Sequence, residues 1–265
     1  MTEIVFIGLG LHDEMGISLR GLEEIKTADT VFIELYTNLL PNFSTENFQK
    51  ISGKTLTSVS RKELEEEGGQ KILRAAETGK AVLLVPGDPL IATTHIALRL
   101  EAEKKRIKTH IIHGASIISA VEGLSGLHNY KFGKSVTVPF PENFSETPYE
   151  VITQNRKLEL HTLCLLDIQV EKKRCLSIKE SLESLLKIEE KNKKRIITMK
   201  TLGVGIARAG SKNPIVKADF LENLLNYDFG APPYSVIFPG KLHFMEAEAL
   251  IVLAGAPKKV MEMAK

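Results

Sequence analysis

The chain of 265 residues is 43% hydrophobic and 26% charged, which suits a folded core and excludes a mainly disordered chain. Lys and Arg total 35 against 33 for Asp and Glu, a net charge of +2, so we expect no direct binding to nucleic acid or to a charged membrane surface. No secretory leader and no apolar run of about 18 residues stand in the sequence, so we expect a cytoplasmic protein without a membrane span. Cys164 and Cys175 form no metal or redox motif and are expected to be free thiols.

Apolar runs typical of strands alternate with periodic segments typical of helices through the first half of the chain, the pattern of an α/β fold with parallel strands. Ser18 precedes a segment in which Leu19, Leu22 and Ile25 share one face, so we expect a helix capped by Ser18. Strands are predicted at 4–7, 30–35, 81–85 and 109–113. Further helices are predicted at 61–78, on the surface, at 96–105, and from Ser116 onward.

The second half of the chain shows the same kind of alternation without repeating the first half. Strands are predicted at 161–168, 204–209 and 234–238, and helices at 177–187 and 245–254. Because 265 residues exceed the length of a typical domain, we expect two α/β domains. The predicted boundaries are 1–112 for the N-terminal α/β domain, 113–134 for a connecting helix and linker, and 135–265 for the C-terminal α/β domain.

The loop after the first predicted strand carries part of a dinucleotide-binding fingerprint. Gly8-x-Gly10 follows the strand, and Glu34 ends the next one, roughly where a ribose-binding acid would stand. However, Asp13 occupies the position of the third glycine, and the expected helix starts about eight residues after Gly10, too far for a pyrophosphate to lie against its N-terminus. The sequence therefore favours glycines that only permit a tight loop over a nicotinamide site.

The segment PGDPLIATTH, residues 86–95, follows the buried strand at 81–85, where ligands of open α/β sheets bind. Its two prolines stiffen the loop, and a glycine between them permits a positive φ. Thr93 or Thr94 is expected to cap the following helix, so Asp88 is not needed as a cap. Two interpretations of Asp88 remain open: contact with a cationic or hydroxyl-bearing ligand, and an Asx hydrogen bond within the turn.

Other polar groups carry weaker signals. His110 and His113 are three positions apart on a predicted strand and so face opposite sides, and joint metal binding is not expected. Basic runs at 104–106, 172–174 and 191–195 are expected to be solvated faces, with docking of a protein partner as the alternative.

Several segments spread along the chain together point to one family. They are IGLGL near the start, PGDPLIATTH, HGASIISAV, LHNYKFGKSVTV, LLDIQ, ARAGSKNP and DFGAPPYSVIFPGKLHFMEAEAL. From residue 4 to about residue 257, the chain resembles the tetrapyrrole methylase superfamily of S-adenosylmethionine-dependent methyltransferases. The Gly-Asp-Pro loop indicates only that class, whereas LHNYKFGKSVTV and FPGKLHFMEAE are narrower markers, similar to the diphthine synthase family within it.

The resemblance implies two α/β domains of the tetrapyrrole methylase type, a homodimer, and S-adenosylmethionine bound in the interdomain cleft, with S-adenosylhomocysteine as product. This cofactor has no phosphate, so an incomplete dinucleotide fingerprint is expected. Tyr234 stands where many relatives have histidine. The family's cofactor-binding positions fall on Leu11, Asp88, Ile91, Ser116, Ile117, Leu166, Ala209 and Tyr234.

The side chains at these positions suit that cofactor. Asp88 would accept hydrogen bonds from ribose hydroxyls or from the ammonium group, and Ser116 would add a hydroxyl contact. The aliphatic side chains would enclose the adenine and the thioether.

The reaction that the resemblance implies is methyl transfer to the amino nitrogen of a modified histidine on translation elongation factor 2. In archaeal members it is repeated to a trimethylammonium, and in eukaryotic members a carboxylate is methylated as well. Alignment of an unprotonated amine is the main requirement, so no catalytic residue is assigned. If a general base assists, His95 is the candidate, with capping or packing as the alternative.

Two other functions remain open from the sequence. One is a tetrapyrrole methyltransferase of the same superfamily, acting on precorrin or uroporphyrinogen. The other is a non-enzymatic nucleotide-binding or scaffold protein.

Overall fold

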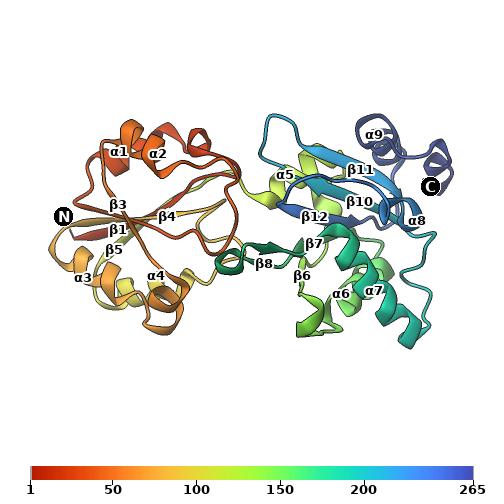
Figure 1. Ribbon diagram of the computed structural model, residues 1–265, viewed down its shortest axis with the longest axis horizontal. Helices are drawn as coiled ribbons and strands as arrows, with labels where there is room; N and C mark the ends of the chain where they lie inside the picture. Colours follow the sequence, from red (N-terminus) through yellow and green to blue (C-terminus); the bar gives the residue numbers. More distant parts are fainter. Residues whose placement is uncertain (1, 265) are drawn as a thin grey trace. The chain divides into compact units, whose positions relative to one another are not determined.

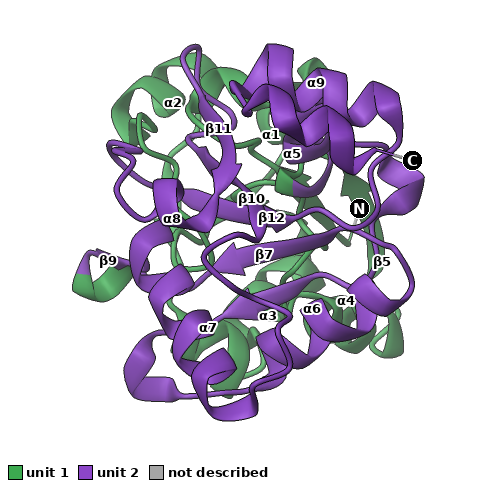
Figure 2. Cartoon of the chain, turned by 90° about the vertical axis from the view of Figure 1, so that its right-hand side faces the viewer, with its two compact units in different colours: residues 1–117, 170–172 green, residues 118–169, 173–265 purple. Residues whose placement is uncertain are grey.

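The chain forms two compact units in the computed structural model, which describes residues 2–264 (Figures 1 and 2). Unit 1 contains residues 1–117 together with 170–172, and unit 2 contains residues 118–169 and 173–265. The division after Ile117 lies inside the segment 113–134 that we predicted to connect two domains. Both units combine strands and helices, so the predicted α/β class is confirmed.

Unit 1 is built on a sheet with the strand order β3-β2-β4-β1-β5, in which every pair is parallel. Its strands are β1 (Glu3–Gly8), β2 (Thr30–Ile33), β3 (Leu56–Ser58), β4 (Lys80–Val85) and β5 (Lys108–Ile112). The chain leaves β1 toward one edge of the sheet and leaves β4 toward the other. The loops after these neighbouring strands therefore stand where the strand order reverses, which is where doubly wound sheets bind ligands.

Helices cover both faces of this sheet (Figure 1). Successive side chains of a strand point to opposite faces. Ile4 and Phe6 of β1 share a core with α3 and α4, whereas Val5 and Ile7 share one with α1 and α2. The apolar strands are thus buried on both sides, as in other parallel sheets. The helices are α1 (Leu19–Lys26), α2 (Thr45–Ser52), α3 (Gln70–Thr78) and α4 (Ile96–Lys104).

The predicted surface helix at 61–78 is wrong as one continuous element. Gly68 and Gly69 both adopt positive φ, 63° and 66°, and they separate a π-helical turn at Lys62–Glu66 from α3. The conformational freedom of two adjacent glycines ends the first helical segment. α3 is also not simply a surface helix, because Ile72 on its inner face is fully buried.

Unit 2 contains a sheet with the order β11-β10-β12-β7-β6, in which only the β6–β7 pair is parallel. The alternation of elements favoured parallel strands. The pairing differs because β10 is followed by β11, which was not predicted, through a turn rather than a helical crossover. The strands are β6 (Val136–Val138), β7 (Thr162–Leu166), β10 (Leu202–Ala207), β11 (Ile215–Phe220) and β12 (Tyr234–Phe238), with a small ribbon of β8 (Ile168–Gln169) and β9 (Arg174–Cys175).

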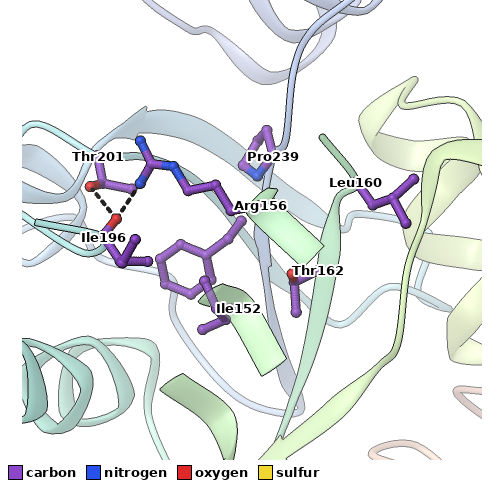
Figure 3. Close-up of a pocket in the computed structure, with 8 residues that line it drawn as sticks. Ile152, Arg156, Leu160, Thr162, Ile196, Thr201 and Pro239 are labelled. Atoms are coloured by element: carbon purple, nitrogen blue, oxygen red, sulfur yellow. Dashed lines mark hydrogen bonds between the residues drawn. The ribbon is translucent and has the colours of Figure 1, made fainter. Parts of the chain in front are cut away.

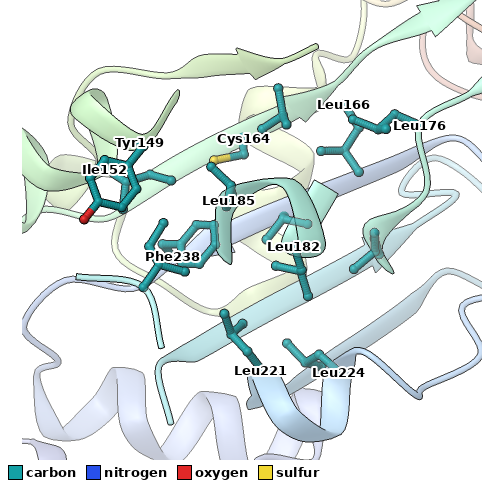
Figure 4. Close-up of a cluster of buried hydrophobic side chains, with 14 of the residues drawn as sticks. Tyr149, Ile152, Cys164, Leu166, Leu176, Leu182, Leu185, Leu221, Leu224 and Phe238 are labelled. Atoms are coloured by element: carbon teal, nitrogen blue, oxygen red, sulfur yellow. The ribbon is translucent and has the colours of Figure 1, made fainter. Parts of the chain in front are cut away.

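Helices α6, α7 and α8 pack on one face of the unit 2 sheet around a core that includes Tyr149, Leu182, Leu185 and Phe238 (Figure 4). α5 and α9 lie on the opposite face in Figures 1 and 2. No helix within residues 2–264 is both long and apolar enough to cross a bilayer. The helices are α5 (Ile117–Ser125), α6 (Thr147–Lys157), α7 (Ile178–Asn192), α8 (Leu221–Leu224) and α9 (Phe244–Ala254). Short 3₁₀ turns lie at Glu14–Gly16, Asn129–Lys131, Pro141–Asn143, Val170–Lys172 and Lys258–Met263.

Side-chain caps fix the starts of several helices. The predicted cap of α1 is confirmed, since the Ser18 hydroxyl accepts a hydrogen bond from Gly21 N at 3.1 Å. α7 begins with a capping box in which Ser177 and Glu180 satisfy each other's backbone N–H groups. α9 begins with the same arrangement, built from His243 and Glu246.

Candidate functional site

The loops after β1, β4 and β5 meet through three glycines at one edge of the unit 1 sheet. A Cβ on Gly8 would lie 2.4 Å from Gly87 O and 2.5 Å from Gly114 N. No side chain fits at such distances, so the backbones approach each other because these positions are glycine. Gly10 and Gly87 also exchange two backbone hydrogen bonds, of 3.2 and 2.6 Å. The first loop and the Gly-Asp-Pro loop are therefore one interlocked structure.

Asp88 lies in these interlocked loops with both carboxylate oxygens in use. Oδ1 accepts a hydrogen bond from Leu90 N at 3.1 Å, so the Asx interpretation from the sequence is confirmed. Oδ2 accepts a hydrogen bond from Nδ1 of His113, at the end of β5, at 2.7 Å. A carboxylate offers about four acceptor positions, so Asp88 retains capacity for a ligand beside these two contacts.

The other predicted residues of unit 1 lie on the same three loops. Leu11 lies on the first loop, and its side chain faces the Gly-Asp-Pro loop: a Cβ placed on Gly87 would be 3.9 Å from Leu11 Cδ2. Ile91 is 42% exposed on the Gly-Asp-Pro loop. Ser116 and Ile117 follow β5 and lead into α5. Unit 1 thus groups five of the eight predicted residues at the carboxyl ends of β1, β4 and β5.

The remaining three predicted residues lie at one edge of the unit 2 sheet. Leu166 ends β7, and Tyr234 begins the neighbouring strand β12. Ala209 follows β10, which pairs with the other side of β12. Arg208 N donates a hydrogen bond to Pro233 O at 2.9 Å, which ties the segment containing Ala209 to the residue before Tyr234. The eight predicted residues therefore form two groups, one in each unit.

The side chain of Tyr234 is engaged within unit 2. Its hydroxyl donates a hydrogen bond to Gly230 O, and burial raises the pKa of the phenol. The phenol is thus held in its neutral form by its own loop, where many relatives are expected to carry an imidazole.

The first loop lacks the geometry of a dinucleotide site. Asp13 caps a 3₁₀ turn, and α1 begins only at Leu19. Glu34 is fully buried and accepts hydrogen bonds from the backbone N–H groups of Tyr36 and Thr37. A buried carboxyl group with these partners is not available to a ribose, which agrees with the preference against a nicotinamide site.

The predicted threonine cap of α4 is wrong. Thr93 Oγ1 donates to Pro89 O at 3.1 Å, and Thr94 Oγ1 donates to Glu65 Oε1 at 3.1 Å. His95 occupies the N-cap position without a capping hydrogen bond. It is only 2% exposed, and its Nδ1 donates to Pro89 O at 3.2 Å. His95, the candidate general base, therefore faces the interior of unit 1.

Potential metal ligands and thiols are dispersed. His110 and His113 contact different carboxylates, at 3.2 and 2.7 Å. Within residues 2–264, no group of three or more His, Cys, Asp or Glu side chains is arranged to hold a metal ion. Cys164 and Cys175 are free, as predicted, and burial raises the pKa of both thiols.

A small pocket in unit 2, shown in Figure 3, lies apart from the predicted residues. Its lining is mostly apolar, and Arg156 on its wall donates a hydrogen bond to Ile196 O. It has room for about a single water molecule, too little for a cofactor. The lining residues are Ile152, Arg156, Leu160, Thr162, Ile196, Thr201, Phe238 and Pro239.

A buried carboxylate in α9, Glu246, joins the two narrower marker segments, LHNYKFGKSVTV and FPGKLHFMEAE. It accepts hydrogen bonds from His128 N and His161 Nε2, both at 2.9 Å, and from His243 N at 2.8 Å, and it pairs with Lys131. Burial alone would raise its pKa, but these donors together lower the pKa of Glu246 to about 2. The fold thus ties two distant segments of the sequence to one ionised side chain.

Known proteins resemble this chain over both units. The family model described as "Tetrapyrrole (Corrin/Porphyrin) Methylases" matches residues 3–211. The diphthine synthase of Methanosarcina acetivorans is 47% identical over 266 residues, which cover 98% of each chain. The diphthine synthase of Methanocorpusculum labreanum is 49% identical over 95% of this chain and 99% of its own. A crystal structure of diphthine synthase matches with a TM-score of 0.90 at 44% identity, over 98% of this chain and 99% of that one.

Proposed function

Since this chain belongs to the tetrapyrrole methylase family and is a methyltransferase, we propose that it acts as a diphthine synthase. In this proposal it uses S-adenosylmethionine to methylate the amino group of the modified histidine on translation elongation factor 2, repeatedly, to a trimethylammonium. The observation that carries the proposal is the 47% identity to a diphthine synthase over 98% of both chains. A likeness of that extent includes both groups of predicted site residues.

The interlocked loops of unit 1 suit S-adenosylmethionine. Gly8, Gly87 and Gly114 let the backbones of the three loops pack directly against one another, which fixes the loop that carries Asp88. Asp88 adds spare acceptor capacity for hydroxyl or ammonium groups. When bound, the cofactor supplies a methyl group on a positively charged sulfonium. We propose that it occupies the cleft between the two domains and contacts Leu11, Asp88, Ile91, Ser116, Ile117, Leu166, Ala209 and Tyr234.

The contribution of the chain to the reaction is binding and alignment. A methyl group on a sulfonium is already activated, so the acceptor amine needs a free lone pair and an in-line approach. Alignment of this kind supplies about 7 to 11 kcal/mol in favourable systems. Because His95 is buried with Nδ1 committed to Pro89 O, we assign no general base and propose that the amine loses its proton to solvent.

A tetrapyrrole methyltransferase is the second candidate function. The observation that favours it is the description of the matching family model, which refers to corrin and porphyrin substrates. The two candidates share the cofactor and differ in the acceptor, an amine on a protein or a carbon of a macrocycle.

Parallel incubations with radiolabelled S-adenosylmethionine distinguish these functions. One contains elongation factor 2 carrying the methyl-free modified histidine, and the other contains uroporphyrinogen. We expect label in the protein fraction only. Label confined to the porphyrin fraction would establish the second candidate, and no label in either fraction, together with no cofactor binding, would leave a non-enzymatic role.

The resemblance also supports a homodimer that works in the cytoplasm. Val252 and Leu253 on α9 are 72% and 58% exposed, which provides an apolar surface for contact between two copies. Light scattering after size-exclusion chromatography tests the dimer, and a monomer at micromolar concentration would contradict it.

A further inference from the structure

Two buried ionisable side chains meet behind the Gly-Asp-Pro loop, at the ends of elements far apart in the sequence. Glu34 follows β2 and is 0% exposed, and His95 precedes α4 and is 2% exposed. His95 Nε2 lies 3.9 Å from Glu34 Oε1. This nitrogen is buried and makes no hydrogen bond with the part of the chain that the structure describes. The pair lies within unit 1.

The hydrogen bonds of the pair determine where its protons are. A carbonyl oxygen only accepts, so His95 Nδ1 must carry the proton that it donates to Pro89 O at 3.2 Å. In a neutral ring, Nε2 then presents a lone pair toward Glu34 Oε1. At 3.9 Å these two atoms are too far apart for a hydrogen bond, and a further proton on the carboxyl group or on the imidazole removes the unfavourable approach of two acceptors.

The surroundings of the pair favour its uncharged form. Burial is the largest influence on both groups, and it raises the pKa of Glu34 and lowers the pKa of His95. Donors to Glu34 from Tyr36 and Thr37 and the positive charge of Arg61 oppose this. Glu65 is the other charged group near the imidazole. Its negative charge opposes the effect of burial, because it favours the protonated ring and so acts to raise the pKa of His95. The burial of both groups outweighs these neighbours.

The pair is connected directly to the loop that carries Asp88. Pro89, whose carbonyl His95 holds, is the next residue after Asp88, and Thr93 Oγ1 donates to the same oxygen at 3.1 Å. Asp88 in turn accepts the hydrogen bond from Leu90 N. A change in the position of the His95 ring would therefore release one of the two donors that fix the turn beside Asp88.

We propose that Glu34 and His95 are positioning residues that hold the Gly-Asp-Pro loop in the conformation that binds the cofactor. Glu34 orients the imidazole, and the imidazole fixes the Pro89 carbonyl. The inference rests on the proposed binding of S-adenosylmethionine by Asp88. A loop that spends less time in the binding conformation lowers the apparent affinity in proportion.

Variants of His95 separate the hydrogen bond to Pro89 from simple packing. His95→Phe keeps the ring and removes the donor, and we expect the Kd for S-adenosylmethionine to rise roughly three- to tenfold, the effect of one lost hydrogen bond. His95→Asn places an amide N–H near the position of Nδ1, and we expect the Kd to stay within about twofold of wild type. Thr94→Val is the matched control, because this hydroxyl contacts Glu65 rather than the Pro89 carbonyl.

Variants of Glu34 test the role of this proton. In Glu34→Gln the amide oxygen accepts from the backbone of Tyr36 and Thr37, and the amide N–H₂ donates toward His95 Nε2, so affinity is retained. In wild type Glu34 loses its proton as pH rises above its raised pKa, two acceptors then face each other, and the Kd increases. The glutamine has no such proton, so its Kd stays level over the same pH range.

Calorimetric titration of the full chain with S-adenosylmethionine is the test, with thermal melting of each variant as a check on folding. Weaker binding by His95→Phe, rescue by His95→Asn and a level pH profile for Glu34→Gln are expected. Equal Kd values for wild type and His95→Phe, or a wild-type pH profile for Glu34→Gln, would overturn the inference. If wild type itself does not bind the cofactor, the proposed function fails, and that result is distinct from either of these.

Discussion

Replacement of Glu246 by glutamine should destabilise the chain by about 3 kcal/mol at neutral pH. The pKa of this carboxyl group falls from an ordinary value of 4.5 to about 2 in the folded chain. Each tenfold change in proton affinity corresponds to about 1.4 kcal/mol, so the fold favours the ionised form by about 3 kcal/mol. Loss of one partner from a buried ion pair costs a similar amount. Glutamine adds a donor where Lys131, His161 and two backbone N–H groups already donate.

The contribution of Glu246 has a defined pH dependence. A carboxyl group whose pKa is lowered by folding stabilises the protein fully above its unfolded pKa, and the stabilisation is lost as pH falls through the folded pKa. The difference between wild type and Glu246→Gln should therefore be constant near neutrality and shrink between pH 4.5 and about 2. His161, whose pKa burial lowers, adds a further loss of stability in acid, and this loss is larger in Glu246→Gln because the hydrogen bond and charge of Glu246 raise the pKa of His161.

Urea denaturation followed by circular dichroism, at neutral pH and at several acidic pH values, measures this difference. Glu248→Gln is the matched control, because Glu248 lies on the same helix and is exposed, and we expect a change within about 0.5 kcal/mol. The reasoning would be refuted if Glu246→Gln were as stable as wild type at neutral pH, or if its deficit stayed constant into acid.

Three further predictions concern the proposed cofactor site and the thiols. Asp88→Ala should weaken S-adenosylmethionine binding roughly 10- to 100-fold by calorimetry, the effect of a lost hydrogen bond to a charged group; unchanged affinity would exclude Asp88 from the site. Gly8→Ala should unfold or greatly destabilise unit 1, since its Cβ would lie 2.4 Å from Gly87 O, whereas Gly123→Ala in α5, with nothing within 4 Å of its Cβ, should raise stability by about 0.5 to 1 kcal/mol; equal melting temperatures for the two variants would contradict this. Cys164, which is 0% exposed, should react with a disulfide reagent only after unfolding, and rapid labelling of Cys164 in the native chain would show that it is accessible.

Most elements of unit 1 follow from local patterns in the sequence, although α2, β3 and the break at Gly68 and Gly69 were missed, and its site does not follow from them. The apolar runs predicted β1, β4 and β5, and the position of Ser18 predicted the start of α1. The hydrogen bond between His113 and Asp88 depends on β5 lying close to β4 across β1, which no local pattern records. Position 114 must also be glycine because a Cβ there would collide with the Gly87 carbonyl of another loop, and this too cannot be seen in a local pattern.

Long-range contacts also explain what was missed in unit 2. Glu246 lies within an ordinary helical pattern, FMEAEALIVLA, and its role appears only when Lys131 and His161 are brought to it by the fold. The missed strand β11 pairs along its length with β10, and its alternating polar residues, such as Lys217 and Asp219, weakened the apolar signal of a strand. The predicted cofactor positions came from the family resemblance, because no local pattern connects Asp88 with the three positions that lie in the other unit.

The most direct test of the central claim is the mass of the elongation factor 2 peptide that carries the modified histidine, measured before and after incubation with this chain and S-adenosylmethionine. We expect a gain of three methyl groups on the amino nitrogen with wild type, and a strongly reduced gain with Asp88→Ala. An unchanged peptide mass under conditions in which the chain methylates uroporphyrinogen would contradict it.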